Sequence, residues 1–353
     1  MATQNNERPL SDRESTVLHY VVHDFIETAT PIGSRFISKR HEDELGLSSA
    51  SIRNVMSDLE YMGYINHPHT SAGRVPTDLG YRYYLDNLMK MESLPTEQQE
   101  DIKRGLDAAE ERESILHETS KVLSKISRQL CVVTSPQLSA GTIEKMEMIQ
   151  VSSNRVMVII SIKSGLVQTI MMEVSSAIPR EKLDYTARLL NEKLAGLTIK
   201  EVKETFVERL KDTQGEDMGL IRLFVDSVDK LFLRNRSEKL HISGTESILD
   251  QPEFVNPSEF RGIIELISNE EIIIHVLEKQ EGKPKEIRVS IGSENDDEKL
   301  SQYGVITSMY TVGDISGSIG VIGPKRMHYS KMIPLVDYVA KTISQMFDNS
   351  NRI

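Results

Sequence analysis

The segment that most constrains the fold is HPHTSAGRVPTDLGYRYY, residues 67–84, together with the helix patterns that precede it. Its centre, residues 70–73, consists of small residues that turn tightly and expose backbone N–H groups. Arg74 follows, and Pro76 favours an extended conformation for Val75. Thr77 is a residue type that begins helices. The segment therefore predicts a basic-tipped hairpin that leads into a closing helix.

Three helix patterns precede this hairpin. Ser11 and Glu14 have the spacing of a capping box, and apolar residues then recur at helical intervals over residues 17–26. A second, short helix is expected from Ser34, and a third from Ser48. Three helices, a hairpin and a closing helix together predict an N-terminal winged helix-turn-helix.

The third helix has one face suited to a DNA groove. Its apolar residues fall on one side, and the opposite side is small and polar, with an arginine and an asparagine that suit guanine and adenine edges. The short helix and the hairpin tip supply cations and hydroxyls that suit phosphates. The predicted DNA-binding residues are Ser34, Arg35, Ser38, Lys39, Ser48, Ser49, Ala50, Arg53, Asn54, Ser57, His69, Thr70, Ser71 and Arg74. A winged helix used only for protein contacts is the alternative.

Size and charge narrow the class of protein. The chain has 353 residues, which suggests two or three domains, and a net charge of −11, which repels nucleic acid at long range. DNA binding therefore has to be local and geometric. Cys131 is the only cysteine, so neither a disulfide framework nor a cysteine zinc site is expected. The chain has no long apolar run and no signal peptide pattern, so we expect a cytoplasmic protein with no membrane partner.

Residues 46–86 strongly resemble the HrcA family of heat-inducible transcription repressors. The resemblance rests on SIRNVMSDLEYMGYI followed by PHTSAGRVPTDLGYRYY, with PIGSRFISKR upstream and GSIGVIGPKRMHY near the C-terminus. Val55 departs from the acid that family members often carry, and we interpret it as extra packing. The resemblance implies a homodimer on an inverted-repeat CIRCE operator upstream of chaperone operons. It also implies that the GroE chaperonin supports the repressor and that heat abolishes its activity.

The rest of the chain is expected to form an α+β fold. The family implies a GAF-like α+β domain with an inserted helical dimerisation lobe, and we expect the helices of the GAF-like domain to cover one face of its sheet. The predicted divisions are a winged helix over 1–92, the first part of the GAF-like domain with a leading long helix over 93–178, the lobe over 179–237, and the second part over 238–353. Strands are predicted over residues 143–151, 155–162, 166–174, 239–242, 287–291, 304–310 and 317–322, and helices over 96–128, 179–236, 258–267, 270–280 and 330–346.

The sequence does not support a phosphate-binding loop, a metal site or a calcium-binding loop. The glycines of residues 313–323 lack the ending of a phosphate loop, His67 and His69 lack a third metal ligand, and residues 294–298 lack the calcium-loop pattern. The methionines of residues 146–172 are interpreted as core, and Cys131 as structural. We therefore expect no enzyme, no cofactor and no metal.

Three alternatives stay open. The GAF-like domain of such a regulator is able to hold a small-molecule effector, although no residue names one. A protein-interaction scaffold without DNA binding is the second alternative. The apolar residues 220–225 and 231–233 suit a subunit interface or burial inside the lobe equally well.

Overall fold

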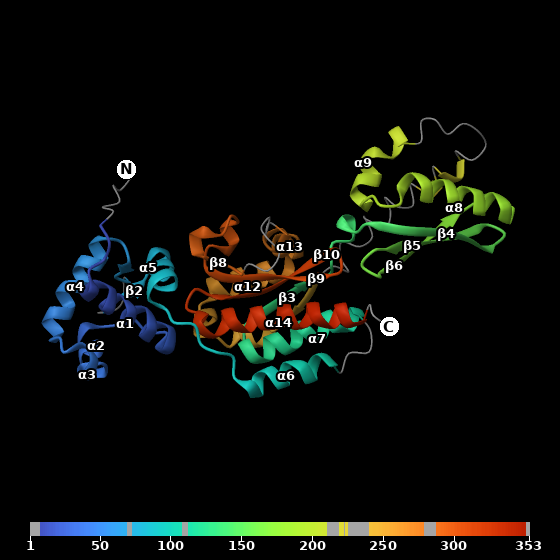
Figure 1. The fold of residues 1–353 in the computed structure, drawn as a ribbon. Coiled ribbons are helices and arrows are strands. Elements are labelled where there is room, and N and C mark those ends of the chain that lie inside the picture. Colours follow the sequence, from blue (N-terminus) through green and yellow to red (C-terminus); the bar gives the residue numbers. More distant parts are fainter. Residues whose placement is uncertain are drawn as a thin grey trace.

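The computed structural model describes residues 8–68, 73–107, 112–209, 219–221, 223–224, 240–278 and 287–350. Figure 1 shows three parts in a row: an N-terminal domain, a central domain and a lobe. The chain mixes helices with antiparallel strands, so the predicted α+β class is confirmed. Among the described helices, none is both long enough and apolar enough to cross a bilayer.

The N-terminal domain contains the predicted elements in the predicted order. Ser11 closes its capping box with Glu14, and Ser48 and Thr77 cap the helices that follow them. A short extra helix, α3, was not predicted. The elements are α1 Asp12–Thr28, α2 Ser34–Arg40, α3 Glu42–Leu45, α4 Ser49–Tyr61, β1 Ile65–Asn66, β2 Val75–Pro76, α5 Asp78–Tyr83 and the π-helical turn η1 Tyr84–Leu88.

The predicted long helix over residues 96–128 is instead two helices, α6 Thr96–Asp107 and α7 Arg112–Ser127, which pack on each other and on α14 Tyr329–Ser350. Each helix has only a narrow apolar stripe, and packing the two together buries both stripes. Gly105 permits the close approach, since a Cβ atom there would lie 2.5 Å from a methyl group of Val122.

The central domain is built on one antiparallel sheet in the order β7-β3-β10-β9-β8. Helices cover both of its faces, so the expectation of helices on one face was wrong. Successive β3 residues alternate between the two sides: Cys131 and Val133 pack towards α7 and α14, and Leu130 and Val132 pack towards α12 and α13. The strands and the covering helices not yet given are β3 Leu130–Thr134, β7 Leu240–Ser243, β8 Arg288–Ile291, β9 Tyr303–Val312, β10 Ile315–Pro324, α11 Thr245–Leu249, α12 Pro257–Ser268 and α13 Glu270–Glu278.

The lobe has its own sheet, in the order β4-β5-β6, and its own hydrophobic core. These strands were expected to belong to the GAF-like domain, but their buried faces share a core with Leu183 and Leu190. The lobe is therefore mixed and begins well before residue 179. Its elements are β4 Ile143–Ser152, β5 Arg155–Ile162, β6 Val167–Glu173, α8 Arg180–Leu194 and α9 Ile199–Arg209.

The apolar residues predicted as either interface or core of the lobe are largely core. Leu220, Ile221 and Phe224 are buried against the lobe strands and helices. Residues 231–233 lie outside the described part of the chain. Hydrogen bonds join the segment that leads into the lobe to the central sheet: Gln137 N donates to Ser316 O in β10 at 2.8 Å, and Thr142 N donates to Asp314 Oδ2 in the turn before β10 at 2.8 Å.

Candidate nucleic-acid interface

Helix α4 presents a polar face at the end of the molecule opposite the lobe (Figure 1). Its apolar side is buried by Ile52, Val55, Met56 and Leu59. Its opposite side is exposed and carries Ala50, Arg53, Asn54 and Ser57, as the sequence predicts. The Ser48 hydroxyl accepts a hydrogen bond from Ser51 N at 3.2 Å and fixes the start of the helix. The exposed face thus has the small profile and the polar groups that entry into a major groove requires.

Helix α2 supplies exposed cations beside this face, but its serines have another role. Arg35 and Lys39 are exposed. Ser34 is only 8% exposed, and its Oγ lies 3.2 Å from Ser49 Oγ on α4. Ser38 is half-buried and donates to Leu47 O at 3.1 Å. Ser34 therefore links α2 to α4, and Ser38 links α2 to the turn that precedes α4. The sequence predicted Ser34 as an exposed phosphate contact, but in the structure its side chain is buried.

The base of the hairpin is held rigidly. Arg74 Nε donates to Glu60 Oε2 at 2.8 Å, so the guanidinium reaches back to the end of α4. Arg74 also exchanges two backbone hydrogen bonds of 2.8 Å with Ile32. A Cβ atom on Gly73 would lie 2.5 Å from the carbonyl carbon of Pro31, so only glycine fits there. The predicted tip residues His69, Thr70 and Ser71 lie outside the described residues.

Sequence reasoning missed Asp24, which joins α1 to the end of α2. Its carboxylate is fully buried, with His41 Nε2 3.0 Å from Oδ2 and Arg40 Nε 3.6 Å from Oδ1. Burial alone would raise the pKa of Asp24, but the contacts with His41 and with His23, whose Nδ1 lies 3.5 Å from Asp24 Oδ1, outweigh it and hold the pKa below its usual value. A lone acid among apolar helix positions was the available signal, but its partners were not evident from the sequence.

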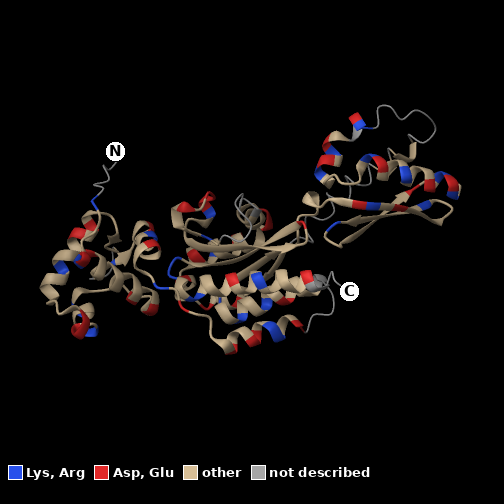
Figure 2. Cartoon of the chain, in the orientation of Figure 1, with Lys and Arg blue, Asp and Glu red and all other residues tan. Residues whose placement is uncertain are grey.

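Charge is distributed evenly around this region. Figure 2 shows acidic and basic residues interspersed over the N-terminal domain and the lobe. Tyr61, at the C-terminal end of α4, is 90% exposed and adds an aromatic ring that the predicted site did not include. The arrangement fits a local, geometric contact with DNA better than long-range attraction.

The glycines of residues 313–323 and Cys131, to which the sequence analysis assigned no catalytic or binding role, take part in the fold. Gly317, Gly320 and Gly323 lie within strand β10, and Gly313 lies in the turn before it with φ of +61°. Burial raises the pKa of the Cys131 thiol to about 12, which suits a structural residue.

Comparison with known proteins agrees with the resemblance found in the sequence. The family model described as "HrcA protein C terminal domain" matches residues 113–333. The Heat-inducible transcription repressor HrcA of Chlorobium phaeobacteroides (strain BS1) is 41% identical over 347 residues, which cover 95% of this chain and 97% of the relative. The protein of the same name from Prosthecochloris aestuarii is 39% identical, covering 97% and 99%. A crystal structure of a protein described as hypothetical has a TM-score of 0.58 and 24% identity, covers 97% of this chain and all of its own, and so supports the fold alone. The chain belongs to the HrcA family of heat-inducible transcription repressors.

Proposed function

We propose that this chain represses heat-shock chaperone operons by binding a CIRCE-type inverted repeat as a homodimer in the cytoplasm. The observation that carries the proposal is the exposed polar face of α4, with Arg53 and Asn54 at its centre, over a fully packed apolar side. The N-terminal domain then acts as a winged helix-turn-helix, and α4 is the helix that enters the major groove. Arg35, Lys39 and the hairpin contact the flanking phosphates.

A two-fold symmetric pair of subunits explains why the operator would be an inverted repeat. The outer face of the lobe sheet is our candidate for the interface. Ile149, Met157 and Met171 are paired across β4, β5 and β6, and of these Ile149 is 43% and Met171 51% exposed. Apolar side chains in such a row favour burial against a second copy. Substitution of Met171 by Glu should then yield monomers in sedimentation, while the exposed Tyr185→Glu on α8 should not.

The family resemblance also leads us to propose control by the GroE chaperonin and a GAF-like central domain. In this scheme heat fills the chaperonin with unfolded clients, and the unsupported repressor loses its DNA-binding form. Operator binding by protein recovered from a heat pulse, measured with and without GroE and ATP, tests this step. Equal recovery in both samples would remove chaperonin control from the proposal.

The DNA-binding proposal is tested by fluorescence anisotropy on the inverted repeat that the protein protects in footprinting. Arg53→Ala and Asn54→Ala should each weaken binding by about 1–3 kcal/mol and relax the base preference at one position. Lys39→Ala should weaken binding to all DNA sequences alike. It should also reduce the slope of the logarithm of affinity against the logarithm of salt concentration by about one unit. Lys341→Ala removes an exposed cation from α14 in the central domain and is the matched control.

Two results would contradict this assignment. A purified protein that protects no inverted repeat at low salt, with or without GroE, would favour the interaction scaffold. Unchanged affinity and base preference in Arg53→Ala would remove α4 as the reading helix.

The small-molecule alternative has one specific feature in its favour, an open cleft of about 160 Å³ between β9 and α14 of the central domain. Thermal-shift screening with metabolites tests that alternative.

A further inference from the structure

The N-terminal domain is docked onto the central domain through charged side chains on α5. Asp78, the first residue of α5, accepts from Lys325 Nζ at 2.7 Å and from Ser293 N at 2.9 Å. Arg82, one turn later, donates from Nε to Glu294 Oε1 at 2.8 Å and from its terminal nitrogen to Val289 O at 2.7 Å. Both ends of one short helix are thus held by the same surface of the central domain.

The central domain is shaped to receive this helix. Gly292 lies against the Asp78 carboxylate, and a Cβ atom there would come within 2.4 Å of both oxygens. Its φ of +56° is also a conformation that favours glycine. Arg326 donates at 3.4 Å to the carbonyl of Ile26 near the end of α1 and is itself paired with Glu253. The contact is therefore specific in shape as well as in charge.

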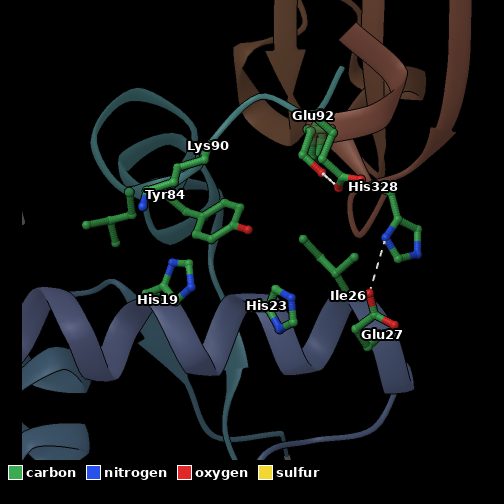
Figure 3. Close-up of a pocket in the computed structure, with 11 residues that line it drawn as sticks. His19, His23, Ile26, Glu27, Tyr84, Lys90, Glu92 and His328 are labelled. Atoms are coloured by element: carbon green, nitrogen blue, oxygen red, sulfur yellow. Dashed lines mark hydrogen bonds and ion pairs between the residues drawn. The ribbon is translucent and has the colours of Figure 1, made fainter. Parts of the chain in front are cut away.

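A second group of contacts lies across the cleft that Figure 3 shows between the domains. This cleft, of about 300 Å³, is lined by residues of α1, η1, the interdomain linker and the start of α14. His328 Nδ1 lies 3.6 Å from Glu27 Oε1 on α1. Glu92, in the linker, donates from its backbone N to Ser330 O at 3.1 Å and accepts from Ser330 Oγ at 2.7 Å. The linker is pinned to the central domain midway along its length.

Apolar packing completes the junction. Tyr81 on α5 is 2% exposed, and Tyr329 at the start of α14 is 1% exposed. Both belong to one continuous hydrophobic core that includes α1, α4, α7 and α14. A linker alone would allow the N-terminal domain to swing, but a shared core with ion pairs at its edge fixes its orientation.

We propose that this junction, formed by Asp78 and Arg82 on α5 with Glu294, Lys325 and Arg326, sets the spacing of the operator half-sites that the dimer accepts. The proposal rests on the proposed function. Residues 89–95 link η1 to α6 and span about 23 Å when extended. One added base pair moves a half-site by about 3.4 Å and turns it by about 34°. A domain held only by the linker tolerates such shifts, whereas a docked domain does not.

The test compares binding to the footprinted inverted repeat, to the same repeat with one or two base pairs added to or removed from its spacer, and to a single half-site. Wild-type protein should lose about tenfold in affinity when the spacer changes by two base pairs. Glu294→Arg, which faces Arg82 with a like charge, should retain single half-site affinity and bind all spacers within about threefold of one another. Arg82→Glu combined with Glu294→Arg should restore the preference for one spacer.

The controls distinguish failure of this inference from failure of the proposed function on which it rests. Lys341→Glu disrupts the Lys341–Asp337 pair on α14, away from the junction, and should leave spacer discrimination intact. If wild-type protein protects no inverted repeat, the proposed function itself fails. If it does, and Glu294→Arg discriminates spacers as sharply as wild type, the inference is overturned. Tighter binding of the natural spacer by Glu294→Arg would also overturn it, because the junction would then inhibit binding. If Glu294→Arg fails to unfold cooperatively, the milder pair Lys325→Gln and Glu294→Gln is measured against the same criteria.

Discussion

Removal of the Asp24 carboxylate should destabilise the N-terminal domain and reduce operator binding. In the wild-type protein the charge-assisted contact with His41, which is 13% exposed, contributes about 1.5–3 kcal/mol. Arg40 is 42% exposed, so its contact adds only about 0.5–1 kcal/mol after solvent screening. Asp24→Ala should therefore lower the free energy of unfolding by about 2–4 kcal/mol. That loss is a large part of the ordinary stability of a domain.

Hydrogen exchange read by mass spectrometry is the assay, because it reports the stability of α1 and α2 separately from the rest of the full-length chain. Peptides of both helices should exchange faster in Asp24→Ala, and operator affinity should fall as α2 moves relative to α4. Asp12→Ala is the matched control, since Asp12 is an exposed acid on the same helix and its loss should cost less than about 1 kcal/mol. Equal effects of the two substitutions would refute the role of the buried carboxylate.

Three further predictions concern stability and reactivity. Gly80→Ala should destabilise the domain by about 1–3 kcal/mol in urea unfolding, because the new Cβ atom would lie 2.0 Å from the carbonyl oxygen of Tyr64. The Arg8 guanidinium lowers the pKa of Glu14 from 4.5 to about 2, so this contact stabilises the fold above about pH 4.5 and is lost as the pH falls towards 2. Glu14→Gln should accordingly flatten the acid limb of the melting temperature against pH, and an unchanged limb would contradict the contact. Cys131 should resist thiol reagents in native protein near pH 8 and react only on unfolding, and prompt native labelling would show that it is accessible.

The starts of the helices could be predicted because capping is a local interaction. Ser11, Ser48 and Thr77 each satisfy a backbone N–H group three residues ahead, so a short stretch of sequence contains the whole signal. The exposed face of α4 followed from helical periodicity in the same way. The contacts of Asp24 and the junction could not be predicted like this, since Arg82 and Glu294 are separated by 212 positions.

Sheet membership was harder to predict than the strands themselves. The three lobe strands and four of the five described central strands were predicted, whereas β3 was missed, and nothing local indicates which of the central strands pair. The burial of β9 and β10 on both faces has a partial local signal, because Val305 and Ile306 in β9 and Val321 and Ile322 in β10 are adjacent apolar residues. Such adjacent apolar residues are typical of a sheet covered on both faces, and the expectation of helices on one face did not take them into account. The identity of those helices depends on contacts distant in sequence.

The way the lobe joins the central sheet has a consequence for how the protein folds. Thr134 ends β3 and pairs with Leu240 at the start of β7, so the whole lobe replaces the turn of an ordinary hairpin. The entropic free energy of closing this loop of about 105 residues is about 3 kcal/mol larger than that of closing a four-residue turn. A lobe that condenses early on the nascent chain would bring the two strand ends together beforehand and remove most of that penalty. By the same geometry, a short turn spliced between the two strands should yield a miniature protein in which the central sheet keeps its register.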